Sequence, residues 1–225
     1  MKKALSFIAA ALLILLITGC SASPSFSYPF NDHYIQMWAE SLKPFSAEIA
    51  FYGDSRVAGT DWGEAFPEEE VVNLGVGGDI IEGTIQRLPL LDALEIKHCF
   101  LAIGGNNCLS SNFNESTFER NYRLLIDKLL ERNIKVYINT IAGVTTANSN
   151  FQDDFINEAN TKISKANRII REIASDYNLP LIDMALFMND ENGILKAEYS
   201  TDGVHFTDAG YSLWFDKIQD YIDLI

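Results

Sequence analysis

The sequence predicts an α/β domain in which helices cover both faces of a parallel sheet of about five strands. Short apolar runs alternate along the chain with longer stretches of helical periodicity, which is the pattern of a doubly wound sheet. The run at 99–103 is apolar throughout, as is typical of a strand buried on both faces. The runs at 49–52 and 99–103 both end in glycine and lead to serine or asparagine, at the edge where such sheets bind ligands.

The first residues have the features of a secretory leader. Lys2 and Lys3 precede an apolar run over 4–17, which is too short to span a membrane as a helix. The run ends in Ile-Thr-Gly-Cys20, which resembles the lipobox of bacterial lipoproteins and implies cleavage before Cys20 and lipidation of its thiol. We therefore expect residues 1–19 to be a signal peptide and Cys20 to anchor an exported protein to the cell membrane. An ordinary cleaved signal followed by a free cysteine is the alternative.

Residues 20–30 have the composition of a tether, with Pro24 and Pro29 among serines. Fully extended, they would reach about 30 Å from the membrane. Residues 31–225 then form one domain without repeats or internal linkers. The formal charge is -14, and removal of the leader's two lysines makes it -16, with 15 basic against 31 acidic residues. So acidic a surface argues against nucleic acid or an anionic polymer as partner.

The elements of the domain follow from local patterns. A periodic stretch with Ile35, Trp38 and Leu42 on one face predicts an opening helix that ends near Lys43-Pro44. Segment 140–151 has little pattern and is expected at the rim of a pocket. Five strands are predicted at residues 49–52, 71–73, 99–103, 134–138 and 181–183.

The later helices are predicted from the spacing of their apolar residues. Ser116 and Glu119 form a capping-box pattern at the start of the second of these helices. The apolar faces contain Ile81, Ile85 and Leu88 in the first helix, Phe118, Tyr122, Leu125 and Leu129 in the second, Ile156, Ile163, Ile170 and Ile173 in the third, and Tyr211, Trp214, Ile218 and Tyr221 in the last.

Ser55 is the first catalytic candidate. It follows the strand at 49–52 directly after Gly53-Asp54, so its hydroxyl lies where an open parallel sheet binds its ligand. A serine hydroxyl is a weak nucleophile at neutral pH and needs an adjacent base that a third group orients.

Of the three histidines, His205 has the nearby carboxylate that this chemistry requires. Asp202 lies three residues upstream, so one turn can bring its carboxylate to one imidazole nitrogen and leave the other nitrogen for Ser55. His33 lies in a polar amphipathic stretch and His98 begins an apolar run, so both are interpreted as surface or core-edge residues. A loop histidine beside an incidental aspartate is the alternative for His205.

Four segments together resemble the sequence blocks of the SGNH, or GDSL, hydrolase family. They are Gly53-Asp-Ser55, the glycine-rich turn that contains Gly78, Gly104-Gly-Asn106-Asn107, and Asp202-Gly-Val-His205, in the family's order and spacing. The resemblance covers about Ile49 to the C-terminus. It implies a three-layer α/β/α domain with a flavodoxin-like sheet. Ser55 would be the nucleophile, His205 the base and Asp202 its partner.

By the same resemblance, the oxyanion hole would consist of the backbone N–H groups of Ser55 and Gly78 and the side-chain amide of Asn106. The chain departs from the family at two positions. Asn107 stands where aspartate is usual, which bears on the hydrogen bonds that hold this loop. Arg56 follows the nucleophile, where an aliphatic residue is common.

Other chemistries find less support. The glycines at 75–78 lack the full G-x-G-x-x-G pattern of a dinucleotide loop. Cys99 and Cys108 are not expected to form a disulfide, because an extended strand would carry the chain about 16 Å from Cys99 before the loop of Cys108. No histidine, cysteine and carboxylate cluster has metal-ligand spacing, so neither a metal nor another cofactor is expected.

The sequence thus predicts a serine esterase that hydrolyses small acyl esters through an acyl-enzyme. The resemblance to the acetylhydrolase-like branch of the family implies an acetyl group, with O-acetylated carbohydrate as the leading substrate class. A lysophospholipase or short-chain lipase, a sugar O-acyltransferase and a non-catalytic glycan-binding lipoprotein remain alternatives. The oligomeric state is left open.

Overall fold

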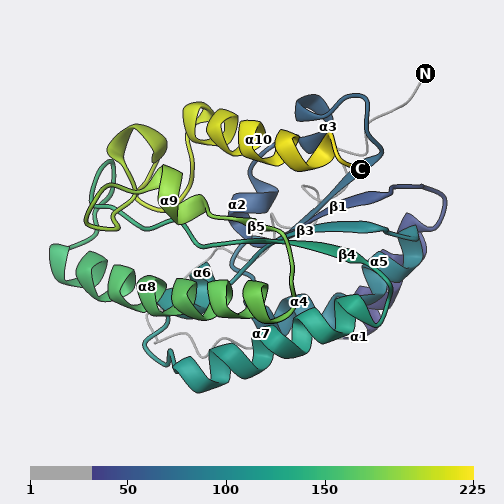
Figure 1. Ribbon diagram of the computed structural model, residues 1–225, viewed down its shortest axis with the longest axis horizontal. Coiled ribbons are helices and arrows are strands. Elements are labelled where there is room, and N and C mark those ends of the chain that lie inside the picture. The colour runs from purple at the N-terminus through teal and green to yellow at the C-terminus, as the bar shows by residue number, and fades with distance from the viewer. Residues whose placement is uncertain (1–31) are drawn as a thin grey trace.

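Five parallel strands form one sheet in the computed structural model, which describes residues 32–225 (Figure 1). Their order across the sheet is β2-β1-β3-β4-β5, so β1 pairs with β2 on one side and with β3 on the other. The chain therefore changes direction across the sheet at β1, and the crevice beyond β1 and β3 is the point where open α/β sheets bind ligands. The strands are β1 Ile49–Gly53, β2 Val71–Gly75, β3 His98–Ala102, β4 Lys135–Asn139 and β5 Leu181–Ile182.

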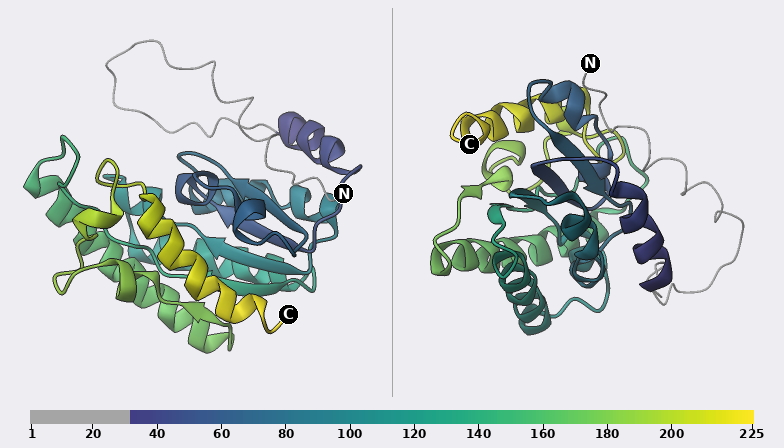
Figure 2. Two further views of the ribbon diagram at one scale, coloured as in Figure 1. Left: turned by 90° about the horizontal axis from the view of Figure 1, so that it is seen from above. Right: turned by 90° about the vertical axis from the view of Figure 1, so that its right-hand side faces the viewer.

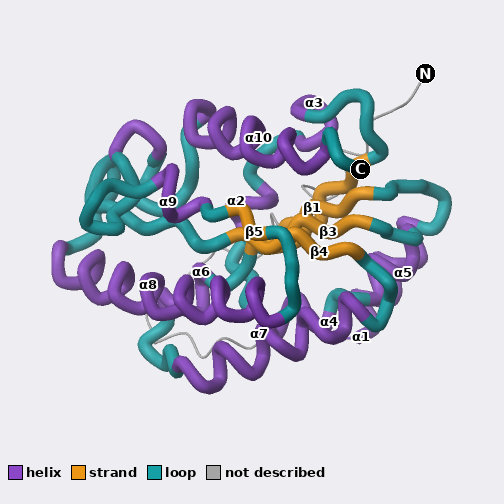
Figure 3. Tube along the Cα trace, in the orientation of Figure 1, coloured by secondary structure: helices purple, strands orange, loops and turns teal. Residues whose placement is uncertain are grey.

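Helices cover both faces of the sheet, which makes the predicted three-layer domain (Figures 2 and 3). One face is covered by α1 Asp32–Leu42, α4 Ile81–Gln86, α5 Pro89–Leu94, α6 Gly105–Leu109, α7 Glu115–Leu130 and α8 Asp153–Asp176. The other face is covered by α2 Ser55–Ala58, α3 Trp62–Ala65, α9 Met184–Met188 and α10 Asp208–Ile222, with a short 3₁₀ helix at Ala197–Tyr199.

Two hydrophobic cores hold the layers together, because successive residues of a strand point to opposite faces. In β1, Ala50 and Tyr52 belong to the core under α7 and α8, whereas Ile49 and Phe51 belong to the core under α10. The second core is aromatic. The rings of Phe51 and Trp62 stack with centroids 3.7 Å apart, and Trp214 meets Trp62 edge-on at 5.1 Å.

The structure corrects two details of the helices. The helix expected from Ile81 to Leu88 ends at Gln86, and a second helix begins at Pro89, a residue that favours the first turn because it has no N–H to satisfy. The predicted capping box of Ser116 and Glu119 is wrong. Asn114 caps α7, because its side chain accepts a hydrogen bond from the Thr117 N–H, and the Glu119 carboxylate accepts one from Arg123.

The expected signal peptide, the lipidation site Cys20 and the tether lie outside the described residues. Among residues 32–225, no helix is long and apolar enough to cross a membrane.

Candidate active site

Ser55 is the first residue of α2 and stands just beyond the end of β1. Asp54 caps this short helix, and its Oδ1 accepts a hydrogen bond of 3.0 Å from the Arg56 N–H. Gly53 is required before it, because a Cβ there would lie 1.9 Å from the carbonyl oxygen of Ala102 on β3. The sequence thus forces a sharp turn that leaves the Ser55 hydroxyl half-buried at the edge of the sheet.

Ser55, His205 and Asp202 form a continuous hydrogen-bonded chain. Nε2 of His205 lies 2.9 Å from Oγ of Ser55, and Nδ1 lies 2.7 Å from Oδ2 of Asp202. The loop that carries the pair is folded on itself, since Oδ1 of Asp202 accepts the backbone N–H groups of Val204 and His205. Partial burial raises the pKa of Asp202, but these hydrogen bonds outweigh it and bring the pKa to about 2. The carboxylate is therefore ionised at neutral pH.

The residues expected in the oxyanion hole lie on two neighbouring turns. Gly78 has a positive φ of 76° on an exposed turn after β2, and Asn106 is the second residue of α6. The two turns are joined, because Nδ2 of Asn106 donates a hydrogen bond of 2.8 Å to the carbonyl oxygen of Asp79. A primary amide has two N–H groups, so this bond fixes the Asn106 side chain and leaves one N–H for a ligand.

A buried ion pair that the sequence did not reveal supports the Gly78 turn. The carboxylate of Asp79 and the guanidinium of Arg87 are fully buried against each other, and Arg87 also donates to the carbonyl oxygens of Leu74 and Gly53. These bonds connect the ends of β1 and β2 to the turn that follows. The cost of removing both charges from water offsets much of their attraction, so a buried pair of this kind is weak evidence for stability.

Arg56, the residue after Ser55, has a structural role that follows from its burial. Its guanidinium donates to the carbonyl oxygens of Val204, Ala142 and Gly143, over distances of 2.8 to 2.9 Å. It thereby ties the loop of His205 to the segment that follows β4. Only the folded structure shows this, since an arginine at this position otherwise suggests an exposed residue.

Asn107 is part of a hydrogen-bonded network rather than a simple replacement for aspartate. Its Oδ1 accepts the N–H of Ile81 at the start of α4, and its Nδ2 donates to Oε2 of Glu82 over 3.1 Å. Glu82 also accepts from the side-chain amide of Asn121. An aspartate at 107 would keep the first bond and replace the second by repulsion between two carboxylates.

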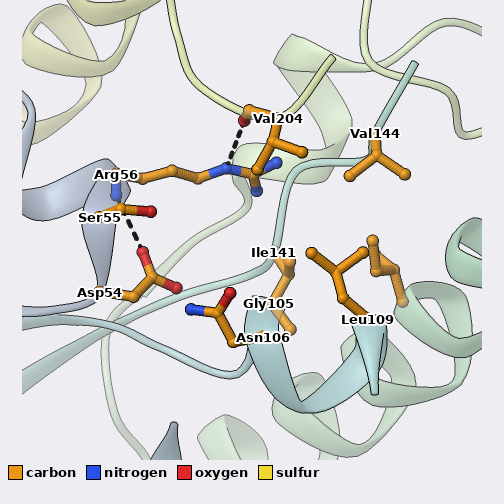
Figure 4. A pocket seen from close by; sticks show the side chains of 10 residues that line it. Asp54, Ser55, Arg56, Gly105, Asn106, Leu109, Ile141, Val144 and Val204 are labelled. Carbon is orange, nitrogen blue, oxygen red and sulfur yellow. Dashed lines mark hydrogen bonds between the residues drawn. The ribbon is translucent and has the colours of Figure 1, made fainter. Parts of the chain in front are cut away.

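A small cavity of about 10 Å³ opens beside Ser55 (Figure 4). The picture places Ser55 and Asp54 on one side and Leu109 and Val144 across from them, with Asn106 below. Burial raises the pKa of Asp54 to about 6, although the charge and N–H of Arg56 act in the opposite direction. The cavity has a polar wall at Ser55 and an apolar wall opposite.

The other histidines and the two described cysteines take no part in the hydrogen-bonded chain of Ser55, His205 and Asp202, although Cys108 lies on α6 between Asn106 and Leu109. His33 is exposed on α1. His98 is the first residue of β3, and its Nδ1 lies 3.3 Å from the hydroxyl of Tyr137 on β4. Cys99 and Cys108 are buried free thiols, and burial raises the pKa of Cys108 to about 12. Among the described residues, no group of three histidine, cysteine or acidic side chains is placed to hold a metal ion.

Fold and site together define a hydrolase of the α/β/α class, with a serine, a histidine and an aspartate at the ligand-binding edge of its sheet. The chain belongs to the GDSL-like lipase/acylhydrolase family, whose sequence profile matches residues 50–213. The resemblance to the SGNH, or GDSL, hydrolase family, the fold class and the assignment as a hydrolase are thereby confirmed. A search of curated proteins found no match.

Solved structures agree with this fold. A GDSL-like lipase from Bacteroides thetaiotaomicron superimposes with a TM-score of 0.73 at 20% sequence identity, covering 86% of this chain and 98% of the other. An acetyl xylan esterase gives a TM-score of 0.62 at 25% identity, covering 77% and 98% of the two chains. A variant of an acetyl xylan esterase from Geobacillus stearothermophilus gives 0.60 at 19% identity, covering 78% and 94%.

Proposed function

We propose that this protein is a serine esterase that removes small acyl groups, above all acetyl, from carbohydrate through an acyl-enzyme. The observation that carries the proposal is the hydrogen-bonded chain from Ser55 through His205 to Asp202, with links of 2.9 and 2.7 Å. A nucleophile, a base in reach of it and a group that orients the base are the parts that acyl transfer needs.

In this mechanism, Nε2 of His205 takes the proton of the Ser55 hydroxyl as Oγ bonds to the ester carbonyl carbon. The carbonyl oxygen becomes an oxyanion, which would be held by the N–H groups of Ser55 and Gly78 and by the free N–H of Asn106. His205 then returns the proton to the departing alcohol. Water attacks the acyl-enzyme by the same route, which releases the acid and restores Ser55. The ionised Asp202 stabilises the imidazolium throughout.

The cavity beside Ser55 favours a short acyl group. Its volume of about 10 Å³ is near the minimum that holds one water molecule, and a methyl group is of similar size. Its apolar wall, which includes Leu109, Ile141 and Val144, suits a methyl group better than a charged or hydroxylated one. Both acetyl xylan esterases among the structural neighbours are named for acetyl esters of a polysaccharide, which is consistent with this substrate class.

Kinetics of three variants test the proposal. Ser55→Ala and His205→Ala should each abolish acetyl ester hydrolysis, and the double variant should be hardly slower than either, because the two residues act as one unit. Substantial turnover by Ser55→Ala would refute the mechanism. Adding a sugar acceptor to the wild type and measuring acetylated product against free acetate would separate hydrolysis from transfer.

We also propose that the enzyme is exported and acts at the bacterial cell surface or in the periplasm, attached to the membrane through a lipid on Cys20. The proposal rests on the Ile-Thr-Gly-Cys20 sequence after an apolar leader. Stable anchoring takes more than one acyl chain, and a lipoprotein cysteine modified on both its thiol and its amine would carry enough. The acidic domain would then meet substrates near the cell surface.

A further inference from the structure

A second, larger pocket of about 180 Å³ lies on the far side of Asn106 from the small cavity. Asn106 lines both spaces, so a molecule in the larger pocket would lie next to the side chain that we assign to the oxyanion hole. The pocket is formed where α4, α6 and the start of α7 meet. We call it the asparagine pocket, because its walls include Asn106, Asn107, Asn112 and Asn114.

The side chains that line the asparagine pocket suit a neutral, hydroxylated ligand. Side-chain amides and hydroxyls dominate, no lysine or arginine is among the described residues that line it, and its one charge is the carboxylate of Glu82. The half-buried ring of Phe113 supplies an apolar surface, and it is itself held by Phe118, with centroids 5.7 Å apart. Amides and a carboxylate match the hydroxyls of a sugar, and an aromatic face matches the C–H side of its ring.

Glu82, Asn107 and Asn114 are held in place before any ligand binds. Glu82 accepts hydrogen bonds from Asn107 and Asn121, which use one lone pair on each carboxylate oxygen and leave the others free to accept hydroxyl groups. Asn114 is fixed as the cap of α7. The Asn112 side chain gives no hydrogen bond to any described residue, so its amide is available to a ligand. Pre-ordered partners reduce the entropy cost of binding.

We propose that the asparagine pocket binds a sugar ring of the substrate while the ester lies at Ser55. This inference rests on the proposed esterase function and adds the place where the carbohydrate is recognised. The small cavity has no room for a ring, whereas the asparagine pocket lies one side chain away and offers both volume and hydrogen-bonding groups. An anionic phospholipid head group would face the Glu82 carboxylate in a pocket whose described lining includes no lysine or arginine.

The test compares an acetylated monosaccharide with ethyl acetate, an ester of the same acyl group that has no ring. Phe113→Ala and Asn112→Ala should each raise KM for the acetylated sugar about tenfold, the factor expected from one lost ring contact or hydrogen bond. Their kcat/KM for ethyl acetate should stay within about twofold of the wild type. Phe45→Ala and Asn157→Ala, at exposed positions that line neither pocket, are the matched controls and should leave the kinetics with both substrates unchanged.

A binding measurement separates this inference from the catalytic mechanism. The Ser55→Ala protein should bind the acetylated monosaccharide, detected by ligand-observed NMR, and the added Phe113→Ala change should remove the signal. If Ser55→Ala retains turnover, the proposed function fails. If Ser55→Ala is inactive but Phe113→Ala and Asn112→Ala leave KM and sugar binding unchanged, or slow both esters equally, the asparagine pocket is not a sugar site.

Discussion

Enlarging the cavity beside Ser55 should change the length of acyl chain that the enzyme accepts. Leu109 lies at the end of α6 on the apolar wall of the cavity and is half-buried. Leu109→Ala removes three carbon atoms from the wall of the cavity, and a butyryl group is two carbon atoms longer than an acetyl group. The variant should therefore admit a chain that the wild-type cavity excludes.

The magnitude follows from the volume of the cavity. The cavity of about 10 Å³ matches one methyl group, so a butyryl chain directed into it would press on the side chains that line it, at a cost of about 1–3 kcal/mol for modest overpacking. At about 1.4 kcal/mol per factor of ten, the wild type should prefer acetyl to butyryl esters by about 5- to 150-fold in kcat/KM. Leu109→Ala should lower this preference by about tenfold or more.

The assay is kcat/KM for ethyl acetate and ethyl butyrate in a pH-stat. Leu130→Ala is the matched control, since Leu130 is also a half-buried leucine that packs on the same core but does not line the cavity. Leu130→Ala should lower the free energy of unfolding by a similar amount and leave the preference for acetyl over butyryl esters unchanged. Equal preferences in Leu109→Ala and wild type, or a wild type that takes butyryl as readily as acetyl, would refute the assignment of this cavity to the acyl group.

Further predictions concern the oxyanion hole, the buried carboxyl and the anchor. Asn106→Ala should lower kcat by about a hundred- to a thousandfold with little change in KM, since its free N–H acts mainly in the transition state, and steady-state kinetics would check this. Asn107→Asp should lower the melting temperature, because its carboxylate would face Glu82, and adding Glu82→Gln should restore most of the loss. Burial raises the pKa of Asp54 from 3.8 to about 6, so the stability that its protonated form contributes is complete only well below pH 3.8 and is lost as the pH rises through 6. Relative to Asp54→Asn, the wild type should therefore lose about 2 kcal/mol of unfolding free energy between pH 4 and 7, measured by denaturant titration; a pH-independent difference would contradict this. Cys20→Ala should move the protein from the membrane fraction to the soluble or secreted one with its activity intact, and retention in the membrane would place the anchor elsewhere.

The sheet and the positions of the candidate catalytic residues could be predicted because their signals are local. The apolar runs at 49–52 and 99–103 are buried on both faces, and the glycine-containing turns after them follow directly in the sequence. Strand limits shifted by only a residue or two, as for β3, which begins at His98 and ends at Ala102. The pattern of Asp202 and His205 likewise lies within one turn of chain.

The features that the sequence did not reveal all depend on contacts between distant segments. Arg56 meets the carbonyl oxygens of Val204 and Ala142, which are far along the chain, so nothing local marks it as buried. Asp79 and Arg87 are close in sequence, but their complete burial follows from the packing of β1 and β2 around them. The cap of α7 was misassigned because Asn114 and Ser116 are both good capping residues, and only the backbone decides between them.

The central claim is that Ser55 attacks the ester, and covalent trapping tests it most directly. The protein would be incubated with a fluorophosphonate and its peptides mapped by mass spectrometry, with His205→Ala treated in the same way. We predict one adduct, on the peptide and side chain of Ser55, formed in the wild type and strongly slowed in His205→Ala, because the hydroxyl then lacks its base. An adduct on another residue, or no adduct on a preparation that still hydrolyses acetyl esters, would contradict it.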